Sequence, residues 1–135
     1  ALLIFNNDTY FKSIRLKSRL LSMRNQKIDG ILGIFNSKDP KYSFVEIDND
    51  DKVIRTKEKK VISNFASTGM YIFSKGSDFI KSAEYAIEKN ILTKNEFYIS
   101  ELYNILIKEG KKITVDVADE FVALGTPEDI KKFEA

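Results

Sequence analysis

The chain has 135 residues, of which 43% are hydrophobic and 31% are charged, and this is enough for one globular domain with a hydrophobic core. Its 22 basic and 20 acidic residues leave a net charge of +2, which argues against a nucleic-acid or acidic-membrane partner. Cysteine and histidine are both absent. Disulfides, Cys/His zinc sites and Ser-His-Asp or Cys-His catalysis are therefore excluded, and any chemistry depends on carboxylates, lysines, hydroxyls, backbone groups or a metal ion.

The ends and the hydropathy of the chain set its expected context. No apolar stretch approaches the length of a membrane span and no secretory signal is visible, so we expect a cytoplasmic protein. A strand-like run begins directly after Ala1, whereas natural N-termini usually carry a few dispensable residues. We therefore expect an N-terminally truncated fragment. Truncation of a sheet would expose an edge or an apolar face, which predicts a tendency to self-associate.

The first ten residues, ALLIFNNDTY, carry the first candidate site. Residues 2–5 form an unbroken apolar run, which predicts a strand buried on both faces, as in a parallel sheet. Asn6, Asn7 and Asp8 follow at its C-terminal end, where open α/β sheets place their ligands. A carboxylate beside two amides offers the oxygen ligands that Mg²⁺ prefers. The same residue types also favour turns, and from these residues alone a turn is the simpler interpretation.

The rest of the chain alternates predicted helices and strands. Residues 11–26 predict a helix and residues 31–35 a second apolar strand, so the first 35 residues are typical of a βαβ unit with parallel strands. The later apolar segments predict further strands at 43–47, 52–55, 68–73, 113–117 and 121–124 and helices at 77–89 and 99–109. Thr126 and Pro127 predict the opening of a last helix. These elements predict one α/β domain, or part of one, over residues 1–135.

Four stretches, in order, cover nearly the whole chain: LLIFNNDTYF, KVIRTKEKKVISNFASTGMYIF, NEFYISELYNILIKEG and FVALGTPEDIKKF. Together they resemble the sugar-phosphate nucleotidyltransferase family, and the third is similar to a segment of its bacterial capsule- and surface-polysaccharide branch. The resemblance implies a nucleotide-diphospho-sugar transferase-like fold, with three α/β/α layers around a mixed, mostly parallel sheet. It also implies Mg²⁺ as cofactor, and a nucleoside triphosphate and a phosphorylated sugar or related metabolite as substrates, with release of pyrophosphate.

Five residues make up the expected site, and the resemblance gives roles to three of them. Asp8 falls on the family's magnesium aspartate, which makes it a metal ligand and a catalytic residue. Glu58 and Lys59 fall on the Glu-Lys pair that handles the sugar and its phosphate, and Lys59 is counted as catalytic too. Asn7, beside Asp8, and Gly69 complete the expected substrate contacts, and a glycine within a predicted strand indicates close approach of a ligand or another backbone. The chemistry is consistent, because a phosphate oxygen must attack another phosphate, and a divalent cation and a lysine offset that repulsion. Without the resemblance, Glu58 and Lys59 are typical of a solvated charge run.

The chain also departs from the family pattern. The Gly-rich nucleotide-binding loop near the N-terminus is missing, so the chain resembles the acceptor-side, C-terminal half or somewhat more of the domain, and we expect the fragment alone to be inactive. Ala123 occupies the position of a second metal aspartate. Asp116, Asp119 or Glu120 could replace that carboxylate; otherwise one carboxylate suffices or catalysis is impaired.

Two other functions stay open at this point. In the first, the protein is a glycosyltransferase of related fold, with residues 6–8 as a DxD-like metal site for a nucleotide sugar. The Glu-Lys segment and the Gly-Thr-Pro helix opening argue against it. In the second, the domain is a degenerate binding or scaffolding module, which Ala123 and the missing loop favour.

Overall fold

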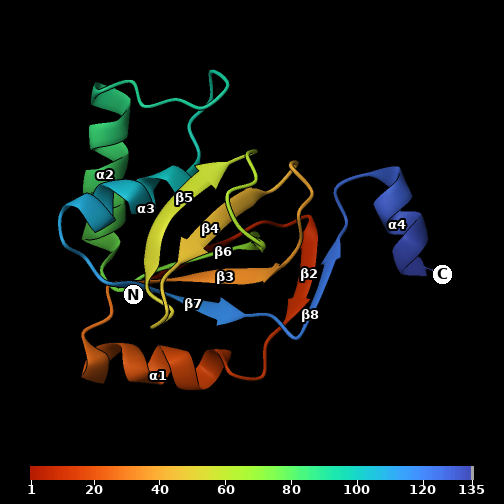
Figure 1. Cartoon of the computed structure of the whole chain (residues 1–135), viewed down its shortest axis with the longest axis horizontal. Helices are drawn as coiled ribbons and strands as arrows, with labels where there is room; N and C mark the ends of the chain where they lie inside the picture. Colours follow the sequence, from red (N-terminus) through yellow and green to blue (C-terminus); the bar gives the residue numbers. More distant parts are fainter. Residues whose placement is uncertain (135) are drawn as a thin grey trace.

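The computed structural model describes residues 1–134, which form a central sheet with helices on both faces and a small two-stranded sheet at one side (Figure 1). The strands are β1 (Leu2–Phe5), β2 (Thr9–Lys12), β3 (Gly30–Asn36), β4 (Ser43–Ile47), β5 (Val53–Glu58), β6 (Phe65–Phe73), β7 (Ile113–Val117) and β8 (Glu120–Ala123). The helices are α1 (Leu16–Gln26), α2 (Gly76–Glu88), α3 (Ile99–Lys108) and α4 (Pro127–Glu134).

The central sheet has the strand order β5-β4-β6-β3-β7. Strand β3 pairs with one edge of β6. On the other edge, β4 pairs with β6 at Ala66, and β1 pairs with residues 70–73 of β6. Every pairing in this sheet is antiparallel except that of β3 with β7. The three-layer α/β/α architecture is confirmed, but the expected parallel majority is wrong. The reason is that β6 lies between β3 on one side and β1 and β4 on the other and runs against all three, while β4 and β5 form a hairpin.

The two strands of the expected βαβ unit, β1 and β3, are not neighbours in the sheet. Because β1 and β3 are both antiparallel to β6, they run in the same direction, but β6 lies between them. The predicted helix at residues 11–26 begins only at Leu16, since Thr9–Lys12 pairs instead with β8 in the small sheet. That pairing joins residues more than a hundred positions apart, and no local sequence pattern indicates it.

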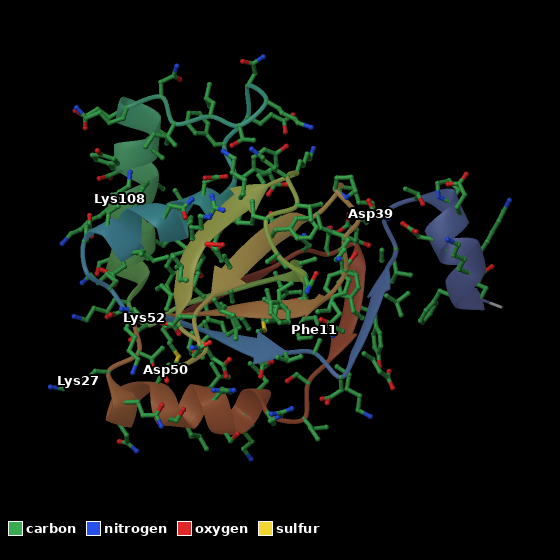
Figure 2. All side chains as sticks on the ribbon, in the orientation of Figure 1. Phe11, Lys27, Asp39, Asp50, Lys52 and Lys108 are labelled. Atoms are coloured by element: carbon green, nitrogen blue, oxygen red, sulfur yellow. The ribbon has the colours of Figure 1, made fainter. Side chains whose placement is uncertain are left out.

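Alternate residues of the sheet build two apolar layers. On one face, Leu32 and Phe73 pack with Tyr103 and Leu106 of α3. On the other face, a second cluster contains Met23 of α1 together with Ile31, Met70 and Ile72. Phe11 of β2 packs against this second cluster at the edge of the sheet (Figure 2). The two faces explain why β3 and β6 are buried along most of their length.

The first strand differs from its prediction. Its residues alternate between partly buried and exposed, with Leu3 50% and Phe5 57% exposed, so β1 is not buried on both faces. Ile14 and Leu21, before and within α1, are exposed as well. Self-association through such apolar surface stays a prediction. None of the helices in residues 1–134 is long and apolar enough to cross a membrane.

Candidate functional site: two adjoining pockets

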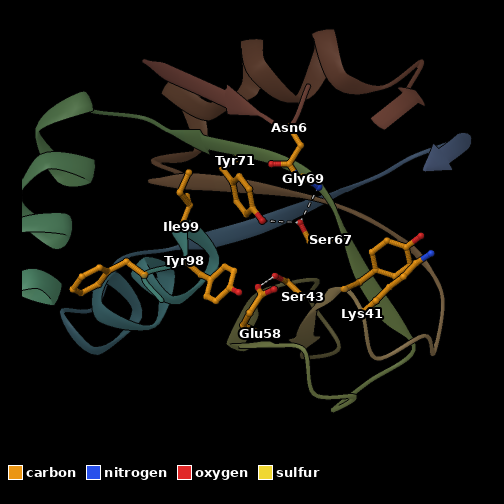
Figure 3. A pocket seen from close by; sticks show the side chains of 11 residues that line it. Asn6, Lys41, Ser43, Glu58, Ser67, Gly69, Tyr71, Tyr98 and Ile99 are labelled. Atoms are coloured by element: carbon orange, nitrogen blue, oxygen red, sulfur yellow. Dashed lines mark hydrogen bonds between the residues drawn. The ribbon is translucent and has the colours of Figure 1, made fainter. Parts of the chain in front are cut away.

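Two pockets of similar size adjoin at the C-terminal end of β1. The first, called the Glu58 pocket, has a volume of about 320 Å³ and contains Glu58 (Figure 3). The second, called the Asp8 pocket, has a volume of about 310 Å³ and contains Asp8. Four residues border both pockets: Asn6, Lys41, Tyr42 and Ser67. The four shared residues place the two pockets side by side.

The floor of the Glu58 pocket is a buried carboxylate held by hydroxyl groups. Glu58 ends β5 and is only 7% exposed. Its Oε2 accepts hydrogen bonds from the hydroxyls of Ser43, on β4, and Ser100, on α3. Its backbone N–H donates to Glu101 Oε1 at 3.1 Å. In residues 1–134 its Oε1 has no hydrogen-bond partner, so this oxygen remains an acceptor for a ligand hydroxyl.

A second group of hydroxyls lies on β6 beside the carboxylate. The Ser67 hydroxyl lies 3.4 Å from the Tyr71 hydroxyl and accepts a hydrogen bond from the Gly69 N–H at 3.0 Å. Burial raises the pKa of Tyr71, so this phenol stays neutral and can both donate and accept. Figure 3 shows these side chains converging from several strands on one hollow. Such a set of hydroxyls and a carboxylate matches a polyhydroxylated ligand.

Gly69 allows the Asn6 side chain to reach both pockets. The Asn6 N–H donates to the Gly69 carbonyl at 3.0 Å, which fixes the chain directly after β1. Gly69 has a φ of +88°, and a Cβ at this position would lie 2.5 Å from Asn6 Nδ2. A side chain here would therefore be strained and would also push Asn6 aside. The close approach expected at Gly69 is thus an approach by Asn6.

The Asp8 pocket is assembled from the two ends of the chain. The Asp8 carbonyl accepts a hydrogen bond from the Leu124 N–H at 2.8 Å, which ties the loop after β1 to the end of β8. A Cβ on Gly125 would lie 2.9 Å from Asp8 Oδ2, so the glycine makes room for the carboxylate. Across residues 1–134 the exposed Asp8 carboxylate has no hydrogen-bonded or ion-paired partner. Ala123, Thr126 and Asp129 line the same pocket.

The carboxylates of the Asp8 pocket fit the Mg²⁺ that the sequence predicts. Mg²⁺ in phosphate-transfer sites is held by one or two carboxylates, substrate phosphates and several waters, so a large protein cage is unnecessary. The described part of the chain contains no group of three or more acidic residues placed to hold a metal. Asp8 provides one free carboxylate and Asp129 a second in the same pocket. Asp116, Asp119 and Glu120 do not line it, and Asp119 instead accepts a hydrogen bond from the Ile14 N–H at 2.8 Å.

The five predicted site residues are distributed as follows. Asp8 lines the Asp8 pocket, and Glu58 and Gly69 line the Glu58 pocket. Asn7 lines neither of them, and its neighbour Asn6 takes the place expected for it. Lys59 also lies outside both linings.

The Lys59 side chain lies at the rim of the Glu58 pocket. Its Nζ is 5.4 Å from the centroid of the Tyr98 ring, and Tyr98 lines this pocket. The Tyr98 hydroxyl raises the pKa of Lys59, with a smaller contribution from Glu58, so the amine is protonated at neutral pH. Its φ of +54° is uncommon for a residue other than glycine and turns the chain sharply at the end of β5.

Sequence reasoning missed two charged residues of the site. Lys41 lies in the loop before β4 and borders both pockets, and Asp129 is in the first turn of α4. The Thr126 hydroxyl accepts the Asp129 N–H at 3.1 Å, which confirms Thr126 as the helix cap. In the sequence, Asp129 belongs to the helix opening at Thr126 and Pro127, which has a complete structural explanation, and no motif marks Lys41.

Comparison with known proteins supports the fold assignment. No protein-family profile matches the chain, and no curated protein matches its sequence. Among solved structures, it is similar to the nucleoside-diphosphate-sugar pyrophosphorylase from Vibrio cholerae RC9, with a TM-score of 0.81 and 28% identity over 98% of the chain.

Two further solved structures share the fold at lower identity. A Bacillus anthracis protein described as a glucose-1-phosphate thymidylyltransferase, solved with sucrose, matches 96% of the chain with a TM-score of 0.72 and 21% identity. A UDP-glucose pyrophosphorylase complexed with UDP-glucose matches 96% with a TM-score of 0.76 and 17% identity. The chain spans only about half of these three neighbours, at 57%, 51% and 53% of their lengths. The chain therefore has a nucleotidyltransferase fold, of which it covers one part.

Proposed function

We propose that the protein containing this chain is a nucleotidyltransferase that joins a nucleoside triphosphate to a phosphorylated sugar or related metabolite and releases pyrophosphate. The observation that carries the proposal is the pair of adjoining pockets, one with a free carboxylate at Asp8 and one with a buried carboxylate at Glu58. The similarity to the Vibrio cholerae pyrophosphorylase supports it. A product that contains both a sugar and a pair of phosphates needs two such neighbouring sites.

In this proposal the Asp8 pocket takes the phosphates. Asp8, helped by Asp129, holds Mg²⁺, which when bound offsets the negative charge of the reacting phosphates. The position of Asp8 beside Gly125 leaves its carboxylate open to solvent and to a cation. The protein's own contribution is to position the reactants and to stabilise charge, because phosphoryl transfer needs little covalent chemistry from the enzyme.

The Glu58 pocket takes the acceptor. The free Oε1 of Glu58 accepts a hydroxyl hydrogen from the sugar, while Ser67 and Tyr71 supply further hydrogen bonds. Gly69 makes room for Asn6, and Asn6, rather than Asn7, contacts the ligand from the loop after β1. Lys59 approaches the acceptor phosphate from the rim beside Tyr98. Both lysine charge and metal charge then oppose the repulsion between the two phosphates.

Three finer points belong to the same proposal. The product serves surface-polysaccharide synthesis in the cytoplasm, as the resemblance of residues 95–110 suggests. Residues 1–135 are the acceptor-side portion of one nucleotidyltransferase domain. Most contacts to the nucleotide base come from outside this chain, so the 135 residues alone turn over no substrate.

The test is an assay of the full-length natural protein with Mg²⁺. Each nucleoside triphosphate is combined with a panel of sugar 1-phosphates and other phosphorylated metabolites, and pyrophosphate release is followed. Release that requires one triphosphate and one acceptor supports the proposal and identifies both substrates. No release with any pair, from a folded protein, contradicts it. Transfer or hydrolysis of a nucleotide sugar without pyrophosphate formation would identify a glycosyltransferase instead.

A second candidate function follows from Ala123, which lines the Asp8 pocket where a second carboxylate is expected. If this loss abolished catalysis, the domain would bind the phosphorylated ligand without converting it. Binding of a sugar phosphate measured by calorimetry, together with no pyrophosphate release, would favour this binding domain.

A further inference from the structure

One basic side chain borders both pockets. Lys41 is the only lysine or arginine among the described residues that line them. The other charged residues of the two linings are all acidic: Asp8 and Asp129 in one pocket and Glu58 in the other. An anionic ligand that extends from one pocket into the other therefore passes a single positive charge in the lining, at the shared border.

The backbone at Lys41 is firmly placed although the residue lies in a loop. The carbonyl of the next residue, Tyr42, accepts the Lys59 N–H at 3.0 Å, which ties the loop to the end of β5. The Tyr42 ring packs edge-on against Phe35 of β3, at 5.1 Å, and Phe121 of β8, at 5.8 Å between centroids. These contacts anchor the base of the Lys41 side chain to both sheets.

The ammonium group itself is exposed, and among the described residues it pairs only with a surface carboxylate. Its Nζ lies 3.8 Å from Asp39 Oδ2 and 5.1 Å from the centroid of the Tyr42 ring, and the Lys41 side chain is 49% exposed. Tyr42 raises the pKa of Lys41, with Asp129 and Asp39 adding to the effect, so the side chain is cationic at neutral pH. An exposed ion pair such as that with Asp39 is weak, and a phosphate can replace the carboxylate as its partner.

We propose that Lys41 is a phosphate-binding residue of the reaction, and that its ammonium contacts the phosphates where the two pockets meet. This inference rests on the proposed function. In that reaction an acceptor phosphate oxygen forms a bond to the α-phosphorus, and the bond to the β-phosphate oxygen breaks, with its electron pair leaving on pyrophosphate. Lys41 donates hydrogen bonds to the reacting oxygens throughout and transfers no proton.

Lys41 and Lys59 can be separated by experiment because they approach from different sides. In Figure 3, Lys41 and Tyr98 lie on opposite sides of Ser43, and the Lys59 ammonium lies over the Tyr98 ring. Lys38 provides a matched control, since it is an exposed lysine of the same loop that lines neither pocket. Figure 2 shows Asp39, between Lys38 and Lys41, on the side of the sheet that faces α4.

The test uses the full-length natural protein with Lys41→Met, Lys41→Arg and Lys38→Met. Methionine keeps the alkyl stem on the Tyr42 ring and removes only the charge, so folding is retained, and thermal melting checks this. We expect Lys41→Met to lower kcat/KM about ten- to a hundredfold, because a charge-assisted hydrogen bond is lost. Lys41→Arg should restore most of the activity, and Lys38→Met should stay within about twofold of wild type. A Lys41→Met enzyme within that same range would overturn the inference.

Calorimetric binding of pyrophosphate gives a readout that does not require turnover. We expect Lys41→Met to weaken this binding about tenfold or more, and Lys38→Met to leave it unchanged. A wild-type protein that catalyses nothing but binds pyrophosphate in a Lys41-dependent manner would overturn the proposed function and support this inference. Equal affinity of wild type and Lys41→Met, or no binding by wild type, would overturn the inference itself.

Discussion

The two pockets differ in how completely the chain builds them. The Glu58 pocket has a buried carboxylate whose Oε2 is fixed by Ser43 and Ser100, so its geometry exists before any ligand arrives. The Asp8 pocket presents an exposed carboxylate without a hydrogen-bonded partner in residues 1–134, lined in part by the last helix. In the proposed reaction the chain therefore preorganises the acceptor side, whereas a metal ion and the substrate would complete the phosphate side.

Removal of the Asp8 carboxylate tests the proposed role of the Asp8 pocket and has the largest expected effect. We expect Asp8→Asn to lower the rate of pyrophosphate release by the full-length protein about a hundred- to a thousandfold, because the proposed metal site would lose one of its two carboxylates. Excess Mg²⁺ should recover part of the loss. Asp50→Asn, in the exposed turn after β4, is the matched control and should retain full activity. Unchanged activity in Asp8→Asn would remove Asp8 from the metal site.

The Glu58 pocket is tested by the isosteric change Glu58→Gln. We expect the KM for the acceptor to rise about ten- to a hundredfold, with a smaller effect on the triphosphate, because a buried charged acceptor is replaced by a neutral amide. Glu46→Gln on β4 is the control, since that carboxylate pairs with Arg55 at 3.1 Å at the surface. A rise in the KM of the triphosphate instead would exchange the roles of the two pockets.

The border between the pockets is tested by Gly69→Ala. We expect a loss of about 1–3 kcal/mol in the free energy of unfolding, because the methyl group meets Asn6 and the φ of +88° is unfavourable for alanine. Thermal melting of the 135-residue chain measures this. Gly76→Ala is the control, since a Cβ there meets nothing within 4 Å and its φ is not in the left-handed region. Equal melting temperatures for both variants would show that Asn6 is not held against Gly69.

The smallest expected effect comes from a change at Thr126, which lines the Asp8 pocket. Thr126→Ala removes the cap that accepts the Asp129 N–H, and we expect it to cost about 1 kcal/mol of local stability at α4. Hydrogen exchange of the α4 amides should rise, while exchange in β6 should not change. Thr126→Ser retains the hydroxyl and should behave as wild type. Faster exchange in β6 would mean that α4 and the acceptor pocket are coupled.

The sequence predicted the parts of the site that lie in recognisable local patterns. Asp8 follows an apolar strand, and Glu58 and Gly69 belong to a stretch that resembles a family motif, so their residues could be named in advance. Whether they act as proposed stays a prediction. Lys41 could not be found, because its position depends on Tyr42 packing against Phe35 and Phe121, which come from different strands.

The fold shows the same division between local and long-range information. Helices α2 and α3 and strands β4 and β7 were predicted within about a residue at each end, since their apolar periodicity is strong. The pairing of β2 with β8 and the antiparallel direction of most of the sheet were not, because both depend on contacts between distant segments. The short turn between β4 and β5 is a local sign of one antiparallel pair, whereas the insertion of β6 between β3 and β4 has no local sign.

The most direct test of the two-pocket arrangement is a crystal structure of the full-length protein with Mg²⁺ and the nucleotide sugar that it forms. We expect the sugar hydroxyls to contact Glu58 and the phosphates to lie at the shared border beside Lys41, with the cation on Asp8. A nucleotide base in the Glu58 pocket, or phosphates remote from Asp8, would contradict this expectation.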